Sequence, residues 1–213
     1  MVKTLLAYGD SNTYGYPPMA ERGVPARFGP ETRWPRVMAT ALGPDWHVLE
    51  EGLPGRTTSL SDPVMGHHMN GLEGLRIALG SHRPVDHLLI MLGTNDLKTR
   101  FAPSTEKITA GAAALLDIAL HADTQALQDG MDVLLICPPP VRERGCLAGE
   151  FFGAEAVAPR LEDHFQTLAE AKGARFFDAG SVIETSDLDG VHFEAGAHEA
   201  LGKALAMFIG PPA

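Results

Sequence analysis

The sequence predicts an α/β protein, a three-layer α/β/α sandwich around a five-stranded parallel sheet in the flavodoxin-like order 2-1-3-4-5. Three observations predict the parallel sheet and its helical layers. The chain has five short apolar runs, and four of them end in Gly, Pro or Asp, as strands buried on both faces do. Segments with helical periodicity lie between these runs. Alternation of strand and helix produces right-handed βαβ units, which assemble a parallel sheet.

The predicted strands are the apolar runs themselves, at residues 5–8, 47–49, 85–92, 131–137 and 174–177. The third run is stopped by Gly93 and the fourth by three consecutive prolines that begin at Pro138. Runs of this length suit strands better than helices, which need 10–12 residues to show their period.

The predicted helices cover residues 34–42, 70–79, 103–119, 155–172 and 194–208. The first carries Trp34, Val37, Met38 and Leu42 at i, i+3, i+4 and i+8, which places them on one helical face. Glycines follow the first and fourth helices, as is common after a helix C-terminus. The chain of 213 residues contains no repeat, low-complexity tract or linker, so we expect one domain over residues 1–213.

Composition narrows the class of protein. Apolar residues make up 45% and charged residues 21%, as in ordinary globular proteins, and the formal charge is -10. A field of this sign repels phosphate backbones, so we expect no nucleic-acid partner. No stretch approaches the roughly 20 apolar residues of a membrane span, and residues 1–7 lack the pattern of a signal peptide. We therefore expect no membrane partner and a cytoplasmic location.

Polar blocks follow four of the predicted strands. Because ligands of open α/β sheets bind beyond the carboxyl ends of the strands, these blocks should meet at one edge of the sheet. The blocks are Gly9-Asp10-Ser11-Asn12, the segment around Gly55, Gly93-Thr94-Asn95-Asp96, and residues 187–193 with Asp189 and His192.

The residue types in these blocks match what acyl transfer requires. A serine hydroxyl such as that of Ser11 needs an adjacent base to take its proton. A histidine serves only when a carboxylate holds its other nitrogen, and Asp189 and His192 are close enough in sequence to meet in one turn. The backbone N–H groups of Ser11 and Gly55 and the amide of Asn95 are candidate oxyanion donors. Alone, each block could be a turn or a helix cap.

These four blocks, in this order, resemble those of the SGNH (GDSL-type) hydrolases. The segments 50–53, 55–58, 90–96, 138–140 and 176–183 resemble the bacterial arylesterase/acyltransferase branch of that family. The resemblance implies a serine esterase of short-chain and aryl esters with Ser11, Asp189 and His192 as catalytic residues. It further implies an acyl-enzyme resolved by water, an alcohol or hydrogen peroxide, and a homo-oligomer, often an octamer.

Two residues depart from the family pattern. Asn12 stands where the family name expects Leu, and Gly55 stands where close relatives carry Ala. The resemblance implies that three long Pro- and Gly-rich loops, at residues 16–33, 59–69 and 138–154, narrow the entrance to the site. As residues that line the substrate pocket, we expect Asp10, Asn12, Tyr16, Trp34 and Val191, with Asp10 orienting its loop and Trp34 either at the entrance or in the core.

Two other functions fit the same pattern. The natural substrate could be an acetylated sugar, which would make the protein a carbohydrate acetylesterase. The fold could instead serve as a non-catalytic, flavodoxin-like ligand-binding module, although that leaves the Asp189/His192 pair unexplained. The histidines lack metal-ligand spacing and no phosphate-binding or dinucleotide motif is present, so we expect neither a metal nor a cofactor.

Overall fold

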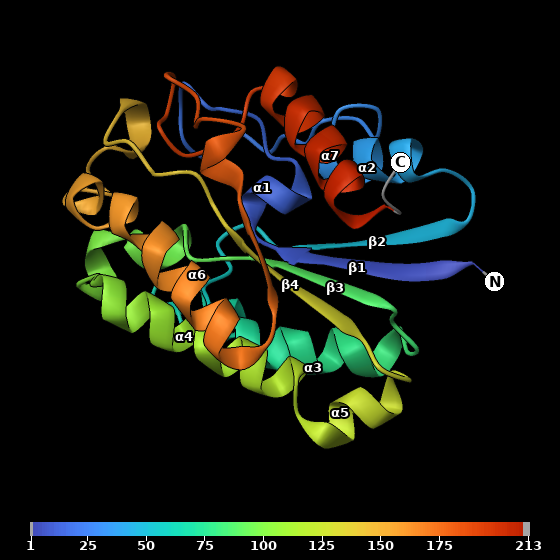
Figure 1. The fold of residues 1–213 in the computed structure, drawn as a ribbon. Helices are drawn as coiled ribbons and strands as arrows, with labels where there is room; N and C mark the ends of the chain where they lie inside the picture. The colour runs from blue at the N-terminus through green and yellow to red at the C-terminus, as the bar shows by residue number, and fades with distance from the viewer. Residues whose placement is uncertain (1, 211–213) are drawn as a thin grey trace.

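The computed structural model describes residues 2–210 and is built on a five-stranded parallel sheet (Figure 1). Its strand order is β2-β1-β3-β4-β5, and every neighbouring pair is parallel. The predicted order 2-1-3-4-5 is confirmed. The strands are β1 (Lys3–Gly9), β2 (Trp46–Gly52), β3 (His87–Met91), β4 (Asp132–Cys137) and β5 (Arg175–Asp178).

Helices cover both faces of the sheet (Figure 1). On one face lie α3 (Gly71–Ser81), α4 (Thr105–Ala119) and α6 (Leu161–Lys172), with the short α5 (Ala122–Leu127) after α4. On the other face lie α2 (Trp34–Leu42) and α7 (Ala195–Ile209). The predicted three-layer sandwich is confirmed. None of the helices within residues 2–210 is long and apolar enough to cross a lipid bilayer.

Two apolar cores, one on each face, explain why the strands are continuous apolar runs. In β1, Leu6 and Tyr8 pack into the core under α3, α4 and α6, while Leu5 and Ala7 pack into the core under α2 and α7. All four side chains are fully buried. Because successive residues of a strand point to opposite faces, every side chain of a strand that is covered on both sides is buried and is preferably apolar.

Within residues 2–210, the structure moves the start of one predicted helix and contains two short α-helices beyond the five predicted, α1 (Ser11–Tyr14) and α5. The predicted helix 155–172 begins only at Leu161, because Pro159 lacks the N–H that an α-helix through this position needs. The residues before it form two short 3₁₀ turns, Ala154–Ala156 and Ala158–Arg160. Helix α5 was not predicted, since six residues are too few to show a helical period.

A buried histidine lies between α7 and the start of α2. The Nδ1 of His198 accepts the backbone N–H of Trp34 at 3.3 Å, and its ring packs edge-on against Phe28 and Phe193. Its Nε2 has no hydrogen-bond partner within the residues that the structure describes. Burial, with a smaller contribution from the charges of His192 and Arg33, lowers the pKa of His198 to about 4.

This histidine should make stability depend on pH. Between the ordinary pKa of about 6.5 and the folded value, the unfolded state binds a proton that the folded state does not, so stability falls as pH drops. The loss is at most about 3 kcal/mol. His198→Asn keeps an acceptor near the Nδ1 position and removes the titration. We expect the difference in free energy of unfolding between wild type and variant, measured in urea, to shrink from pH 7 to pH 4.5. A difference independent of pH would refute this assignment.

Candidate active site

Ser11 lies at the carboxyl end of β1, where the chain turns directly into the short helix α1 (Ser11–Tyr14). The carboxylate of Asp10 caps this helix by accepting the N–H of Asn12 at 2.9 Å. The turn is tight, since a Cβ at Gly9 would lie 2.0 Å from the hydroxyl of Thr13. Ser11 is therefore held at the edge of the sheet where the parallel strands end.

The structure brings Ser11, His192 and Asp189 together, although Ser11 and His192 are separated by 181 positions. The Oγ of Ser11 lies 3.1 Å from Nε2 of His192, and Nδ1 of His192 lies 2.7 Å from Oδ2 of Asp189. Ser11 and His192 are each 5% exposed and Asp189 is fully buried. These distances are within hydrogen-bonding range for a nucleophile, a base and the group that orients the base.

Asp189 is held as a carboxylate. Its Oδ1 accepts the N–H groups of Val191 and His192 at 3.0 and 2.9 Å, and its Oδ2 also accepts the N–H of Met19 at 2.9 Å. Burial alone would raise the pKa of Asp189, but the hydrogen bond from His192, the charge of that ring and the backbone N–H groups together hold the pKa below its ordinary value. A carboxylate at Nδ1 leaves the Nε2 lone pair of His192 facing Ser11.

The turn that carries Asp189 and His192 is closed by backbone hydrogen bonds. The N–H of Gly190 donates to the carbonyl of Ser186, and the N–H of Ser186 donates to the carbonyl of His192, both at 2.8 Å. Gly190 has φ 73°, and a Cβ there would lie 1.9 Å from the carbonyl oxygen of Arg142. A glycine is therefore required at this position.

The predicted oxyanion donors border the same cavity. The Nδ2 of Asn95 donates to Oδ2 of Asp10 at 3.3 Å and to the carbonyl of Arg56 at 3.1 Å. The N–H of Ser11 is the first of α1 and has no acceptor within that helix. Gly55 has φ 91°, a backbone conformation that residues with a side chain rarely adopt, so glycine suits this position better than alanine.

Two buried carboxyl groups tie these loops together. Asp96 accepts the backbone N–H and the hydroxyl of Thr58, at 2.9 and 2.5 Å, and so joins the loop after β3 to the loop after β2. Burial raises the pKa of Asp96 to about 6 despite these bonds. Burial likewise raises the pKa of Asp10 to about 6, opposed by the N–H of Asn12 and by nearby positive charges, first that of His192.

A cavity of about 190 Å³ opens at Ser11, and all three long loops contribute to its wall. Of the predicted pocket residues, Tyr16 and Val191 line it, and the ring of Tyr16 lies 5.3 Å from that of His192. The other lining residues outside the predicted site were missed, because their approach to Ser11 depends on how the chain folds back. They are Met19, Pro54, Met65, Lys98, Leu147, Glu150 and Phe151.

The structure corrects two of the predicted pocket residues, Asp10 and Asn12, and decides between the two positions expected for Trp34. Trp34 is fully buried in the core under α2 and α7 rather than at the entrance, because its helical face points at the sheet. Asp10 and Asn12 lie beneath the cavity and do not line it. The side-chain amide of Asn12 donates to the carbonyl of Val191 at 3.1 Å, which couples the turn of Ser11 to the turn of His192.

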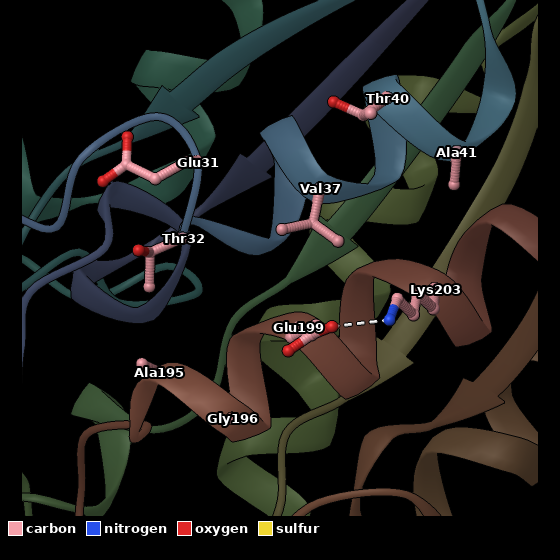
Figure 2. A pocket seen from close by; sticks show the side chains of 9 residues that line it. All are labelled: Glu31, Thr32, Val37, Thr40, Ala41, Ala195, Gly196, Glu199 and Lys203. Atoms are coloured by element: carbon pink, nitrogen blue, oxygen red, sulfur yellow. Dashed lines mark hydrogen bonds and ion pairs between the residues drawn. The ribbon is translucent and has the colours of Figure 1, made fainter.

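A larger hollow, of about 570 Å³, lies between α2 and α7. Figure 2 shows the side chains that line it. Val37 and Thr40 border it from α2, and the ion pair of Glu199 and Lys203 borders it from α7. It contains none of the predicted site residues. Within the part of the chain that the structure describes, no group of three or more His, Cys, Asp or Glu side chains is placed to hold a metal ion.

Comparison with protein families agrees with this arrangement. The model of the GDSL-like lipase/acylhydrolase family matches residues 7–200, which include every residue of the Ser11, Asp189 and His192 cluster. The chain belongs to this family. As a GDSL-like acylhydrolase it is a carboxylic ester hydrolase, so the alternative of a non-catalytic binding module is not supported.

Solved structures of the same fold include two close relatives of this GDSL-like acylhydrolase. An aryl esterase from M. smegmatis is 37% identical, with 97% of this chain and 98% of that chain covered and a TM-score of 0.92. A carbohydrate acetylesterase from Sinorhizobium meliloti is 35% identical, with the same coverage and a TM-score of 0.92. A comparison with curated proteins found no match.

Proposed function

We propose that this acylhydrolase is a serine esterase of short-chain and aryl esters that works through an acyl-enzyme on Ser11. The observation that carries the proposal is the buried chain of contacts from Ser11 Oγ to His192 at 3.1 Å and from His192 to Asp189 at 2.7 Å. A serine in such a chain is an activated nucleophile, and the same three groups recur in acyl transfer on unrelated folds.

In the proposed mechanism, Ser11 Oγ attacks the ester carbonyl while Nε2 of His192 takes its proton. Asp189 stabilises the imidazolium that forms. The N–H groups of Ser11 and Gly55 and the amide of Asn95 stabilise the oxyanion, for which one N–H of Asn95 turns from the Arg56 carbonyl to the charged oxygen. His192 then returns the proton to the leaving alcohol.

The acyl-enzyme is resolved by water, by an alcohol or by hydrogen peroxide. Apolar side chains of Met19, Met65, Leu147 and Phe151 form much of the cavity wall, and a cavity of this size suits a small acyl or aryl group. A wall that excludes bulk water favours acyl transfer to alcohol or peroxide over hydrolysis. We therefore propose transesterification and perhydrolysis as side activities.

A carbohydrate acetylesterase is the second candidate function. Two observations favour it: the 35% identity to the acetylesterase from Sinorhizobium meliloti, and the presence of the charged side chains of Lys98 and Glu150 in the cavity wall. Both candidates use the same nucleophile, so they differ only in the group that the cavity accepts.

We also propose self-association as a homo-octamer. The family resemblance suggests this number, and exposed apolar side chains in the three long loops support association. Val24 is 56%, Val64 74% and Phe152 70% exposed. A cytoplasmic location stays a prediction from the sequence.

The nucleophile is tested by covalent labelling with a p-nitrophenyl alkylphosphonate. We expect one equivalent of p-nitrophenolate to be released per chain as the Ser11 Oγ–phosphorus bond forms, and mass spectrometry to locate the adduct on the peptide of Ser11. Excess ester substrate should slow the labelling, since it occupies the same cavity. An adduct on any other residue, or release without a stable adduct at Ser11, would overturn the assignment.

A further inference from the structure

A buried lysine faces the same cavity as Ser11. The side chain of Lys98 is 7% exposed and contributes to the cavity wall. Its nearest polar neighbours are Sδ of Met65 and Oε1 of Glu150, each 3.7 Å from Nζ. Within residues 2–210, this ammonium donates no hydrogen bond to an oxygen atom, although it has three N–H groups to donate.

The carboxylate of Glu150 does not satisfy these donors. Its Oε1 lies 2.9 Å from the guanidinium of Arg100, and its Oε2 is paired with Arg22. Arg100 also pairs with Asp62 at 2.9 Å. The linked group of Lys98, Arg100, Arg22, Glu150 and Asp62 therefore carries three positive and two negative charges, one positive charge in excess.

Burying an ammonium group in this position costs free energy. A charged group out of water is tolerated when it is paired and hydrogen-bonded, and a thioether is a weak acceptor. Burial lowers the pKa of Lys98, and the charge of Glu150 opposes the lowering. The same charge reaches the floor of the site, because Lys98 is among the groups that lower the pKa of Asp10. The donors of Lys98 are thus available to an oxygen atom that enters the cavity.

We propose that Lys98 determines substrate specificity by donating a hydrogen bond to a hydroxyl oxygen of the ester, outside the reacting carboxyl group. The preferred substrates are then hydroxylated esters rather than their hydrocarbon analogues. This proposal rests on the proposed esterase activity at Ser11 and adds the class of ester that its cavity prefers. The hydroxyl belongs to the alcohol half or to the acyl half of the ester.

Two matched pairs of substrates test it. Propyl acetate and glyceryl 1-monoacetate share a three-carbon alcohol and differ in two hydroxyl groups. Methyl butyrate and methyl 3-hydroxybutyrate differ in one hydroxyl of the acyl half. We expect Lys98→Met to lower the ratio of kcat/KM for hydroxylated over hydrocarbon substrate about tenfold or more in one pair, because a hydrogen bond from a charged donor is lost. The pair whose ratio falls shows whether the hydroxyl belongs to the alcohol half or to the acyl half of the ester.

Lys107→Met is the matched control, because Lys107 is exposed at the start of α4 and donates to the carbonyl of Ala102 away from the cavity. Its ratios should equal those of the wild type. Equal losses of kcat/KM for both members of each pair would mean that Lys98 supports the site without contacting the hydroxyl. Unchanged kcat/KM values for all four substrates would mean that it contacts no part of the ester. Either result overturns the proposal.

The wild type provides a test that needs no variant. It should have the higher kcat/KM for the hydroxylated member of at least one pair, and a preference for the hydrocarbon member in both would overturn the proposal even if Lys98→Met does not fold. Phosphonate labelling separates the two proposals. If Ser11 is labelled but Lys98→Met does not change the kcat/KM ratios, only the proposed role of Lys98 in specificity is rejected. If Ser11 is not labelled, the esterase mechanism itself is rejected.

Discussion

Ser11→Ala is expected to lower kcat for p-nitrophenyl acetate by about 10⁴–10⁶-fold. The variant removes the oxygen that attacks the ester, while His192 and Asp189 stay in place. The remaining rate comes from oxyanion stabilisation and substrate binding alone. Activity is measured as release of p-nitrophenolate from purified protein, with circular dichroism to verify that the variant is folded. Turnover at the wild-type level would show that Ser11 is not the nucleophile.

The chain contains a matched control for this substitution. Ser61 Oγ lies 2.5 Å from Nδ1 of His67, and Nε2 of His67 lies 2.8 Å from Glu73. This second serine–histidine–carboxylate chain is exposed at the surface, with 69% of the His67 side chain and 54% of the Glu73 side chain accessible. Ser61→Ala should leave kcat unchanged, since solvent weakens the electrostatics that a buried site provides. Equal losses from both variants would mean that the assay reports folding rather than catalysis.

Asp189→Asn is expected to lower kcat by about 10⁴-fold. An asparagine at this position can donate to Nδ1 of His192, which would place the ring proton on Nε2, where it cannot accept the proton of Ser11. Asp189 also accepts three backbone N–H groups, those of Met19, Val191 and His192, so the geometry of the turn depends on the same carboxylate.

The control for Asp189→Asn is Asp187→Asn. Asp187 lies two positions away, is 76% exposed at its side chain and pairs with Arg142 and Arg144 at the surface. We expect its kcat to stay within about twofold of the wild type, because exposed ion pairs contribute little. A loss of less than tenfold in Asp189→Asn, with a large loss in His192→Ala, would mean that another group orients the histidine.

The fold was predictable because its signals are local in the sequence. Leu5, Leu6, Ala7 and Tyr8 form one uninterrupted apolar run, and only a strand covered on both faces buries such a run completely. Two features of the helices were not predicted, because their signals in the sequence are local but weak. Pro159 forbids an α-helix through its position, yet a helical pattern runs across it, and the six residues of α5 show no period at all.

The part of the site that could be predicted consists of reactive residues that directly follow strands of the sheet. A rule of parallel sheets places the residues that follow each strand at one edge, and it predicts that Ser11, Asn95 and the Asp189/His192 turn meet there. The spacing of Asp189 and His192, three positions apart across a glycine, already allowed their contact at 2.7 Å.

By itself, the sequence determined the strands and the set of groups that meet at Ser11, because strand burial and the rule for parallel sheets depend on residues close together in the chain. Only the tertiary structure shows that Trp34 belongs to the core and that Lys98, Glu150 and Met65 line the cavity. Loops without periodicity take their course from packing against distant segments, so no local pattern records which of their side chains face the substrate.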